Sequence, residues 1–494
     1  MTDLAAGRSY RDVVTRSVYW QAGGRLAGQA LSWVVSLFVV RILSPTDYGL
    51  AAIAGLVTGL LAMVAELGIG ASAVQVEKLD RERLRNMASV VYLMHGAAFL
   101  LTFLLAPLVA FAYDEPGVEP VMRGLSAMFL LMAVYVLPES LLERDLRFQE
   151  KTTAELAATL TSMLTALGIA LAGGGVWALV GSILMLHLTK AVLFNVMVRM
   201  PLMPRWSAEA VRPFVRYGSI VMFAQIAHYL FSSADVAIGG RVLGKELLGL
   251  YVVTLTVVSV PLDKFMPAIT KVSFAAFSRI QTEPDRVVRN VLRGVRLSSL
   301  LAFPFYFGLA VIAPECIPLI LGDKWAGIVA PLQILCLAFP LRTVAAILPP
   351  ALYAVGRPGT NLGNVIIALA IMSVAFLLGV RRGVNGLALA WGIAYPLVFL
   401  ISSVRALRAL GVPARSFAGA ILPAAFAGAL MGGAVALLRT TVPIPGVALQ
   451  VGVLILVGTL AYAAVLFPLR RYALADLEVV FRRGARAGAP AVQP

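Results

Sequence analysis

The chain has 494 residues, of which 60% are hydrophobic and 13% are charged, and its mean hydropathy is +0.89. A water-soluble domain carries about a quarter charged residues, so these proportions exclude a protein that folds in water over its whole length. The formal net charge of +16 does not indicate a nucleic-acid partner, because the lysines and arginines stand in short blocks between apolar runs. The composition therefore predicts an all-α, polytopic membrane protein.

Apolar runs of membrane-spanning length recur along the chain. A helix needs about 20 such residues to cross the hydrocarbon core. The runs lie near 19–41, 48–72, 86–111, 118–141, 152–173, 175–199, 213–239, 247–270, 293–321, 327–352, 360–380, 384–404, 416–438 and 446–468. We expect about fourteen transmembrane helices, with two uncertain boundaries, at the glycines 173–175 and in the proline-rich run 327–352.

The basic residues between these runs set the orientation. If the N-terminus is cytosolic, most lysines and arginines fall in cytosolic segments, as the positive-inside rule requires. The opposite loops then hold Arg41, Arg241, Lys245, Lys324, Arg381, Arg382 and Arg439. We therefore predict that both termini are cytoplasmic.

The longest cytosolic connection, 273–292, carries apolar residues among its arginines. Its apolar positions are Phe274, Phe277, Ile280, Val287, Val288 and Val291. This pattern favours an amphipathic helix on the inner leaflet over a plain solvated linker. The segments 143–151 and 470–483 are expected to behave in the same way.

The sequence contains an internal repeat. Arg41-Ile-Leu-Ser-Pro-Thr-Asp-Tyr-Gly-Leu50 aligns without a gap with Arg241-Val-Leu-Gly-Lys-Glu-Leu-Leu-Gly-Leu250, and chance is the alternative explanation. A true repeat predicts two six-helix bundles related by an axis along the membrane normal, with a transport cleft between them. The predicted divisions are 1–200 for the N-terminal bundle, 213–404 for the C-terminal bundle, 416–468 for two additional helices and 469–494 for a basic cytosolic tail.

Several motifs resemble those of one transporter family. They are Arg41–Leu50, Glu66-Leu-Gly-Ile-Gly-Ala-Ser-Ala-Val-Gln75, Leu142-Glu-Arg-Asp-Leu-Arg-Phe148, and Ser233-Ala-Asp235 followed by Gly239-Gly-Arg-Val-Leu-Gly244. Together they are similar to the Wzx-type polysaccharide and O-antigen flippases of the multidrug/oligosaccharidyl-lipid/polysaccharide exporter superfamily, including the colanic-acid exporters. Beyond about residue 400 only the pattern of spans matches.

The resemblance implies a substrate and a location. It implies a flippase that moves an undecaprenyl-pyrophosphate-linked oligosaccharide from the inner to the outer leaflet of the bacterial inner membrane, for exopolysaccharide, capsule or O-antigen synthesis. The implied partners are this lipid-linked glycan, membrane lipid, and a polysaccharide polymerase and co-polymerase. No cofactor is implied.

Cations inside the spans are candidates for binding an anionic headgroup. An intramembrane charge costs at least about 2.5–3.5 kcal/mol, so it needs a partner, a wet cavity or access to the interface. Arg342 lies deepest, beside Pro340, and favours a cavity role over a buried ion pair. The other substrate-binding candidates are Arg25, Lys190 and Lys264, whose alternatives are contact with lipid phosphates or a local ion pair.

Acids inside the spans are candidates for ion coupling. Glu66, Glu139, Asp235 and Asp263 could couple transport to protons or pair with the cations, as could the histidines His95, His187 and His228. For each of them, a satisfied partner within the bundle is the simpler explanation. The motifs Gly55-x-x-x-Gly59 and Gly428-x-x-x-Gly432 favour close helix packing.

The sequence offers no sign of an enzyme. It has no P-loop, nucleophile elbow, dinucleotide fingerprint or metal-binding motif, and no outer loop long enough to hold a catalytic domain. We expect a secondary transporter with no catalytic residues and no metal. A drug/cation antiporter or a lipid II flippase of the same superfamily is the alternative, although an antiporter would be expected to centre its cavity on acids.

Overall fold

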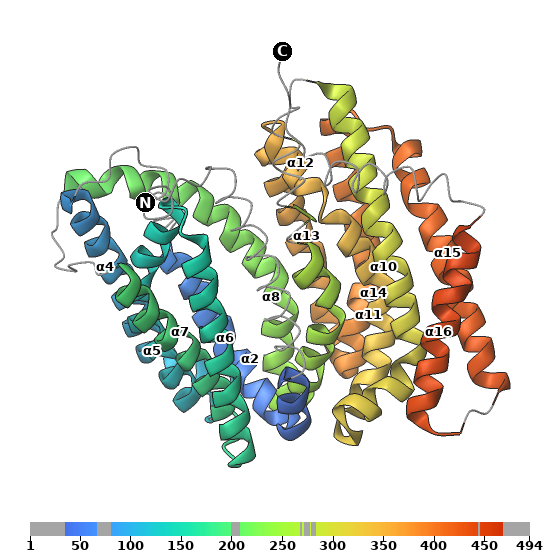
Figure 1. Cartoon of the computed structure of the whole chain (residues 1–494), viewed down its shortest axis with the longest axis horizontal. Helices are drawn as coiled ribbons and strands as arrows, with labels where there is room; N and C mark the ends of the chain where they lie inside the picture. Colours follow the sequence, from blue (N-terminus) through green and yellow to red (C-terminus); the bar gives the residue numbers. More distant parts are fainter. Residues whose placement is uncertain are drawn as a thin grey trace, which may run out of the picture. The chain divides into compact units, whose positions relative to one another are not determined.

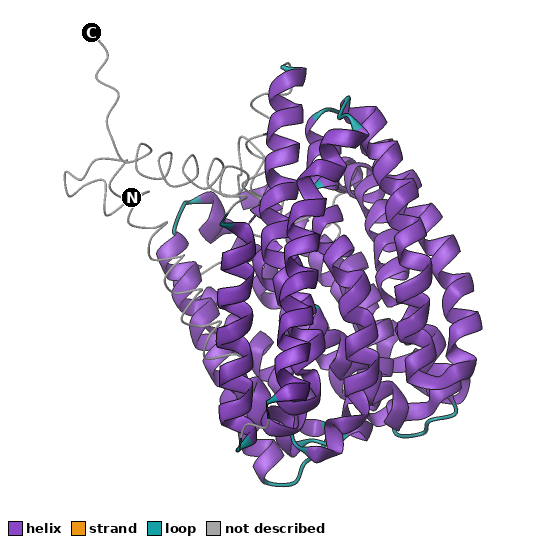
Figure 2. Ribbon diagram, turned by 90° about the vertical axis from the view of Figure 1, so that its right-hand side faces the viewer, coloured by secondary structure: helices purple, strands orange, loops and turns teal. Residues whose placement is uncertain are grey.

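The computed structural model describes residues 35–66, 81–198, 208–266, 269–270, 277, 283–442 and 445–467, without the side chains of 208–224 and 264–265. Every regular element in these ranges is helical, as predicted (Figure 2). Ten helical stretches of the described chain are long and apolar enough to cross a membrane. The expectation of about fourteen spans stays a prediction, since the run 19–41 is described only from residue 35.

The chain divides into two compact units, Met1–Gly249 and Leu250–Pro494. The first unit holds α2 (Pro45–Glu66), α4 (Arg81–Tyr113), α5 (Val118–Arg144), α6 (Phe148–Leu171), α7 (Trp177–Val198) and most of α8 (Ala208–Val258) (Figure 1). The second unit holds the end of α8, η1 (Pro261–Phe265), α10 (Pro284–Leu321), η2 (Asp323–Ile328), α11 (Val329–Ala345), α12 (Leu348–Ala354), α13 (Pro358–Gly379), η3 (Val380–Arg382), α14 (Gly383–Leu410), α15 (Ala414–Thr441) and α16 (Val447–Leu466). The predicted bundle divisions stay predictions.

Helix α5 is central to the first unit, where α2, α4, α6 and α7 all pack on it. The glycines between α6 and α7 end one helix and begin the next. Gly173 and Gly175 have φ values of +79° and +53°, in the left-handed region that a glycine enters without steric cost. The predicted boundary between the runs 152–173 and 175–199 is thus confirmed.

The first copy of the repeat forms the start of α2 as a capping box. The Ser44 hydroxyl and backbone N–H donate to the Asp47 carboxylate at 2.6 and 2.9 Å, and the Asp47 N–H donates to the Ser44 hydroxyl at 3.3 Å. Pro45 at the first helical position needs no hydrogen-bond partner for its nitrogen. In the second copy, Gly244 interrupts α8 with φ 71° and ψ 172°, which confirms a break between the runs 213–239 and 247–270.

The two copies of the repeat pack against each other through equivalent positions. A Cβ on Gly49 would lie 1.8 Å from the carbonyl oxygen of Lys245, and a Cβ on Gly249 would lie 1.7 Å from that of Pro45. Positions 45 and 245, like 49 and 249, correspond in the alignment of the repeat. Such reciprocal contacts are what a local two-fold relation between the copies would give, and a repeat of the two halves stays a prediction.

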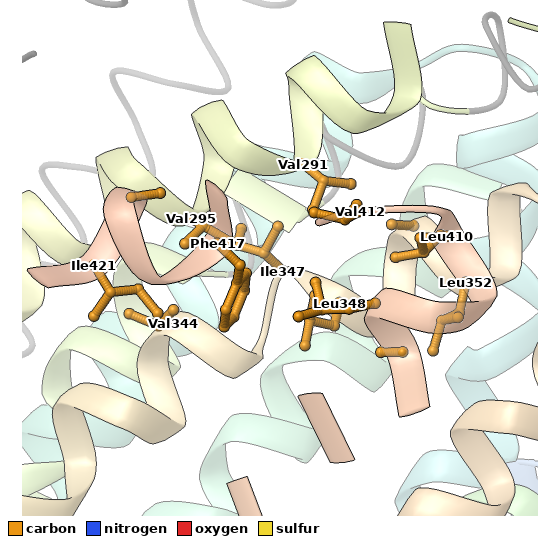
Figure 3. Close-up of a cluster of buried hydrophobic side chains, with 14 of the residues drawn as sticks. Val291, Val295, Val344, Ile347, Leu348, Leu352, Leu410, Val412, Phe417 and Ile421 are labelled. Carbon is orange, nitrogen blue, oxygen red and sulfur yellow. The ribbon is translucent and has the colours of Figure 1, made fainter. Parts of the chain in front are cut away.

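In the second unit, α10 begins earlier than the predicted span. It starts at Pro284, and Phe277, Val287 and Val291 are buried in a cluster with residues of α11, α12, α14 and α15. Figure 3 shows part of this cluster, with Val291 labelled. From residue 284 onward, the prediction of an inner-leaflet helix over 273–292 is therefore wrong, because the apolar side chains pack against other helices of the protein. Residues 271–276 and 278–282 lie outside the described ranges.

Helix α15 packs closely on α10, as the glycine motif predicts. A Cβ on Gly428 would lie 3.1–3.3 Å from Phe303, and one on Gly432 would lie 3.7 Å from Phe307. Helix α16 is tied to α10 by the Tyr462 hydroxyl, which donates to the Leu300 carbonyl at 3.0 Å. In the first unit, Gly59 of the motif Gly55-x-x-x-Gly59 faces the Tyr229 hydroxyl of α8.

The proline-rich run 327–352 is not one continuous helix. Helix α11 ends at Ala345 and α12 begins at Leu348, with Pro349 in its first turn. Prolines lack the N–H that would continue the hydrogen-bond ladder. A broken helix within a span is tolerated where it is buried in protein or lines a cavity, and this break directly follows Arg342.

Candidate functional site

Arg342 lies in the last turn of α11 and is half-buried. Its guanidinium carbon is 4.7 Å from the ring centre of Trp391 and 5.2 Å from that of Phe339. Within the described part of the chain it makes no hydrogen bond and no ion pair. The guanidinium therefore contacts two aromatic rings, and its N–H groups have no acceptor among the described residues.

The aromatic side chains around Arg342 form a buried cluster. Trp391 is fully buried, and its ring centre lies 5.4–5.7 Å from those of Phe339, Phe376 and Tyr395. The Trp391 indole N–H donates to the Tyr251 hydroxyl at 3.1 Å. Because these rings come from α8, α11, α13 and α14, the cluster joins four helices.

Lys190 on α7 is a candidate cation of the first unit that also contacts an aromatic ring. Its ammonium lies 5.5 Å from the ring centre of Tyr135, whose hydroxyl is 3.0 Å from Nδ1 of His187. Over the described ranges Lys190 makes no hydrogen bond or ion pair. Glu66, however, interacts electrostatically with both Lys190 and Glu139, so Lys190 lies in an environment that carries negative charge.

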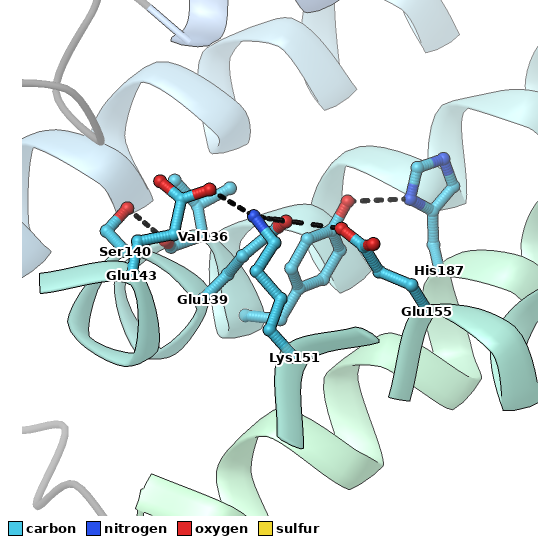
Figure 4. A network of polar contacts seen from close by, with 8 residues as sticks. Val136, Glu139, Ser140, Glu143, Lys151, Glu155 and His187 are labelled. Atoms are coloured by element: carbon cyan, nitrogen blue, oxygen red, sulfur yellow. Dashed lines mark hydrogen bonds and ion pairs between the residues drawn. The ribbon is translucent and has the colours of Figure 1, made fainter. Parts of the chain in front are cut away.

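Lys151 is the centre of an ion-pair network on α5 and α6 (Figure 4). Its ammonium is 2.9 Å from Glu139 and 3.7 Å from Glu155, and it also contacts Glu143. Lys151 is only 8% exposed. The surface helix expected over 143–151 is wrong, because α5 ends at Arg144 and α6 begins at Phe148.

The candidate acids have different surroundings. Glu139 belongs to the Lys151 network. Asp235 on α8 is 1% exposed, and one of its carboxylate oxygens accepts a hydrogen bond from the Val236 N–H at 2.8 Å. Asp263 is exposed in the π-helical turn η1, and Glu66 is exposed at the end of α2.

Two of the four candidate cations cannot be placed against these groups. Arg25 lies outside the described residues, and so does the side chain of Lys264. Among the histidines, His95 is fully buried and bonds the Val91 carbonyl through Nδ1 at 2.9 Å, while His228 packs beside Phe231.

Sequence reasoning missed the partners of these residues. The network could have been suspected from Glu139 and Glu143, and from Lys151 and Glu155, which are four residues apart on one helix face. Nothing in the sequence links Trp391 or Tyr251 to Arg342. In the described ranges there is no group of three or more His, Cys, Asp or Glu residues that could hold a metal ion.

Comparison with known proteins identifies the family. Residues 38–330 match the family described as "Polysaccharide biosynthesis protein". The chain belongs to this family. It is similar to the lipopolysaccharide biosynthesis protein WzxC of Escherichia coli strain K12, with 24% identity over 76% of this chain and 74% of WzxC. It is also similar to the succinoglycan biosynthesis transport protein ExoT of Rhizobium meliloti strain 1021, with 24% identity over 70% of each chain.

The fold is shared with a solved transporter structure. The lipid II flippase MurJ in an inward closed conformation superposes with a TM-score of 0.72, at 13% identity, over 91% of this chain and 99% of MurJ. The chain is thus a multi-pass membrane protein of a polysaccharide biosynthesis family, with the fold of the exporter superfamily to which its motifs are similar.

Proposed function

We propose that the protein is a flippase for undecaprenyl-pyrophosphate-linked oligosaccharide repeat units. It moves them from the inner to the outer leaflet of the bacterial inner membrane by alternating access, acts as a secondary transporter rather than an enzyme, and supplies a polysaccharide polymerase and co-polymerase. In this proposal both termini are cytoplasmic. The observation that carries it is Arg342, a cation inside a span that has aromatic contacts but no acidic partner among the described residues.

The chemistry of Arg342 suits a pyrophosphate. A guanidinium carries five N–H donors in a planar fork that matches pairs of phosphate oxygens. Leaving such a group unpaired within a span costs at least about 2.5–3.5 kcal/mol. An anionic headgroup that passes through the protein would offset this cost while it is bound.

The membrane potential favours the proposed direction. With the cell interior negative, outward movement of an anion gains about 2.3 kcal/mol per charge for each 100 mV. Glu66, Glu139, Asp235 and Asp263 are proposed as coupling or ion-pair residues that modulate this step, and Arg25, Lys190 and Lys264 as further contacts for the headgroup. If transport in proteoliposomes is unchanged after the potential is dissipated, the potential does not drive it.

The decisive experiment replaces Arg342 by Ala, alone and together with Arg25→Ala. We expect loss of surface polysaccharide and accumulation of lipid-linked repeat units in the cytosolic leaflet. Arg286→Ala is a matched control, because Arg286 is exposed and pairs only with the exposed Glu283 among the described residues. Normal export by the double variant would rule out the proposed cationic site.

A drug/cation antiporter remains the second candidate. The observation in its favour is the convergence of Glu139, Glu143 and Glu155 in the first unit. Because Lys151 already pairs with these carboxylates, they favour a structural role over cation binding. Efflux of an organic cation from proteoliposomes that hold the purified protein would support the antiporter.

A further inference from the structure

The position of the Arg342 guanidinium is set by a neighbouring ring. Trp391 gives it the closer of its two aromatic contacts, at 4.7 Å against 5.2 Å for Phe339. A cation over an indole face is held by the ring quadrupole, more strongly where water is excluded. Phe339 stands one helical turn before Arg342 on α11, whereas Trp391 is on α14, so of these two rings the indole is the one that ties the arginine to a second helix.

The Trp391 indole is itself fixed. Its faces and edges are packed by Phe339, Phe376 and Tyr395, and it is fully buried. Its single donor is satisfied by the Tyr251 hydroxyl at 3.1 Å, and Tyr251 is also fully buried. Burial and the engaged N–H both restrict the orientation of this indole.

We propose that Trp391, oriented by Tyr251, is a positioning residue that presents Arg342 to a pyrophosphate headgroup. This inference rests on the proposed function. An arginine side chain has many rotamers, and ordering it on binding lowers affinity. A guanidinium already held against a fixed indole avoids most of this loss.

The same arrangement favours a diphosphate over a monophosphate carrier. Guanidinium donors lie in one plane and bind pairs of oxygens in a fixed fork. A monophosphate offers this fork one pair of oxygens, whereas the second phosphate of a pyrophosphate offers acceptors for the remaining N–H donors as well, so a fork held in one orientation gains more from a pyrophosphate. Loss of the indole should therefore weaken pyrophosphate binding more than monophosphate binding.

The test measures binding of undecaprenyl pyrophosphate and of undecaprenyl phosphate to the purified full-length protein in detergent. Trp391→Leu removes the aromatic face, Trp391→Phe keeps a face without the donor, and Tyr251→Phe removes only the acceptor hydroxyl. We expect pyrophosphate binding to weaken about tenfold for Trp391→Leu and about threefold for the two milder variants. Monophosphate binding should change less than twofold or so.

Each change is repeated in an Arg342→Ala background, where it should have no further effect. Tyr462→Phe is the matched control, because it also removes a tyrosine hydroxyl that donates a hydrogen bond in the same unit, to the Leu300 carbonyl of α10; its pyrophosphate binding should be unchanged.

The outcomes separate the inference from the proposed function. If Arg342→Ala leaves pyrophosphate binding intact, the positioning role and the proposed Arg342 site both fail, whereas the flippase function itself fails only if the native protein does not transport the lipid-linked repeat unit. If Arg342→Ala weakens binding but the Trp391 and Tyr251 variants do not, only the positioning role fails. Equal losses in the presence and absence of Arg342, or equal losses for both carriers, would show that Trp391 serves stability alone.

Discussion

Lys151 and Arg342 are both cations within helices that are apolar enough to span a membrane, but the protein treats them in opposite ways. Lys151 is almost fully buried and meets three carboxylates. Arg342 is half-buried and meets two aromatic faces but no acid among the described residues. A cation that pairs with acids of the protein holds helices together. A cation without such partners can donate its hydrogen bonds to a ligand. A position within a membrane-spanning helix therefore does not by itself make a cation a binding residue.

Lys190 stands between these two cases. It has an aromatic contact with Tyr135, as Arg342 has with Trp391, but it also lies in the field of Glu66. Part of its attraction for an anion is therefore offset. This ranking of the three cations can be tested by substitution.

The largest effect is expected for Arg342→Glu. Reversing the charge replaces attraction of the pyrophosphate by repulsion, so transport of a lipid-linked pyrophosphate in proteoliposomes should fall about a hundredfold or more. The free energy of unfolding should fall by only about 1–2 kcal/mol, the contribution of the lost cation–π contacts, because no protein acid in the described ranges depends on this arginine. A large drop in melting temperature would mean that Arg342 is structural after all.

Lys151→Met should act on stability instead. Removing the cation leaves three carboxylates facing one another, and loss of one partner from a buried ion pair costs about 3–5 kcal/mol. We expect less protein in the membrane and a lower melting temperature in detergent. Lys151→Arg keeps the charge and should recover most of the loss. An unchanged melting temperature for Lys151→Met would contradict the structural role of Lys151 that distinguishes it from Arg342.

A smaller effect is expected for Lys190→Met. Transport should fall about tenfold without loss of folded protein, because the lost attraction is that of one cation whose field is partly cancelled by a nearby acid. Glu66→Gln should have the opposite effect, because it removes a negative charge, and should tighten binding of an undecaprenyl pyrophosphate probe. If both substitutions change binding in the same direction, Lys190 and Glu66 act as one ion-paired unit rather than as opposing charges.

The smallest effect is expected for Glu155→Gln. Its carboxylate is 3.7 Å from the Lys151 ammonium and its side chain is 28% exposed, so the loss in unfolding free energy should stay below about 1 kcal/mol. In the Lys151→Met background the same change should raise the melting temperature, because it removes one of the repelling charges. A further fall in that background would argue against mutual repulsion of these acids.

The sequence predicts the helices well where an apolar run ends in a clear turn. Gly173–Gly175 and Gly244 mark breaks that the backbone angles confirm. It fails where the ends of helices depend on contacts that no local pattern records. Val287 and Val291 suggest a surface helix until the buried partners of α12 and α14 are known.

The site was predictable only in part, for the same reason. Arg342 stands out because a charge in the middle of an apolar run is costly. Trp391 is distant in sequence and is one of 6 tryptophans, so nothing local connects it to that arginine. The position of Lys151 near the end of a span fits both the membrane surface and the protein interior. The contacts with three acids, which the sequence does not record, place it in the interior.

The reciprocal contact at Gly49 and Gly249 involves no side chains at all. A glycine carries a hydrogen in the direction that a Cβ would take, so each of these residues points a C–H group at a carbonyl oxygen of the other copy. Such contacts are worth about 0.5–1 kcal/mol each, which for the pair is only a few times thermal energy. Because both contacts join backbone atoms, a Cβ at either glycine would have to move α2 and α8 apart and could not be accommodated by a flexible side chain.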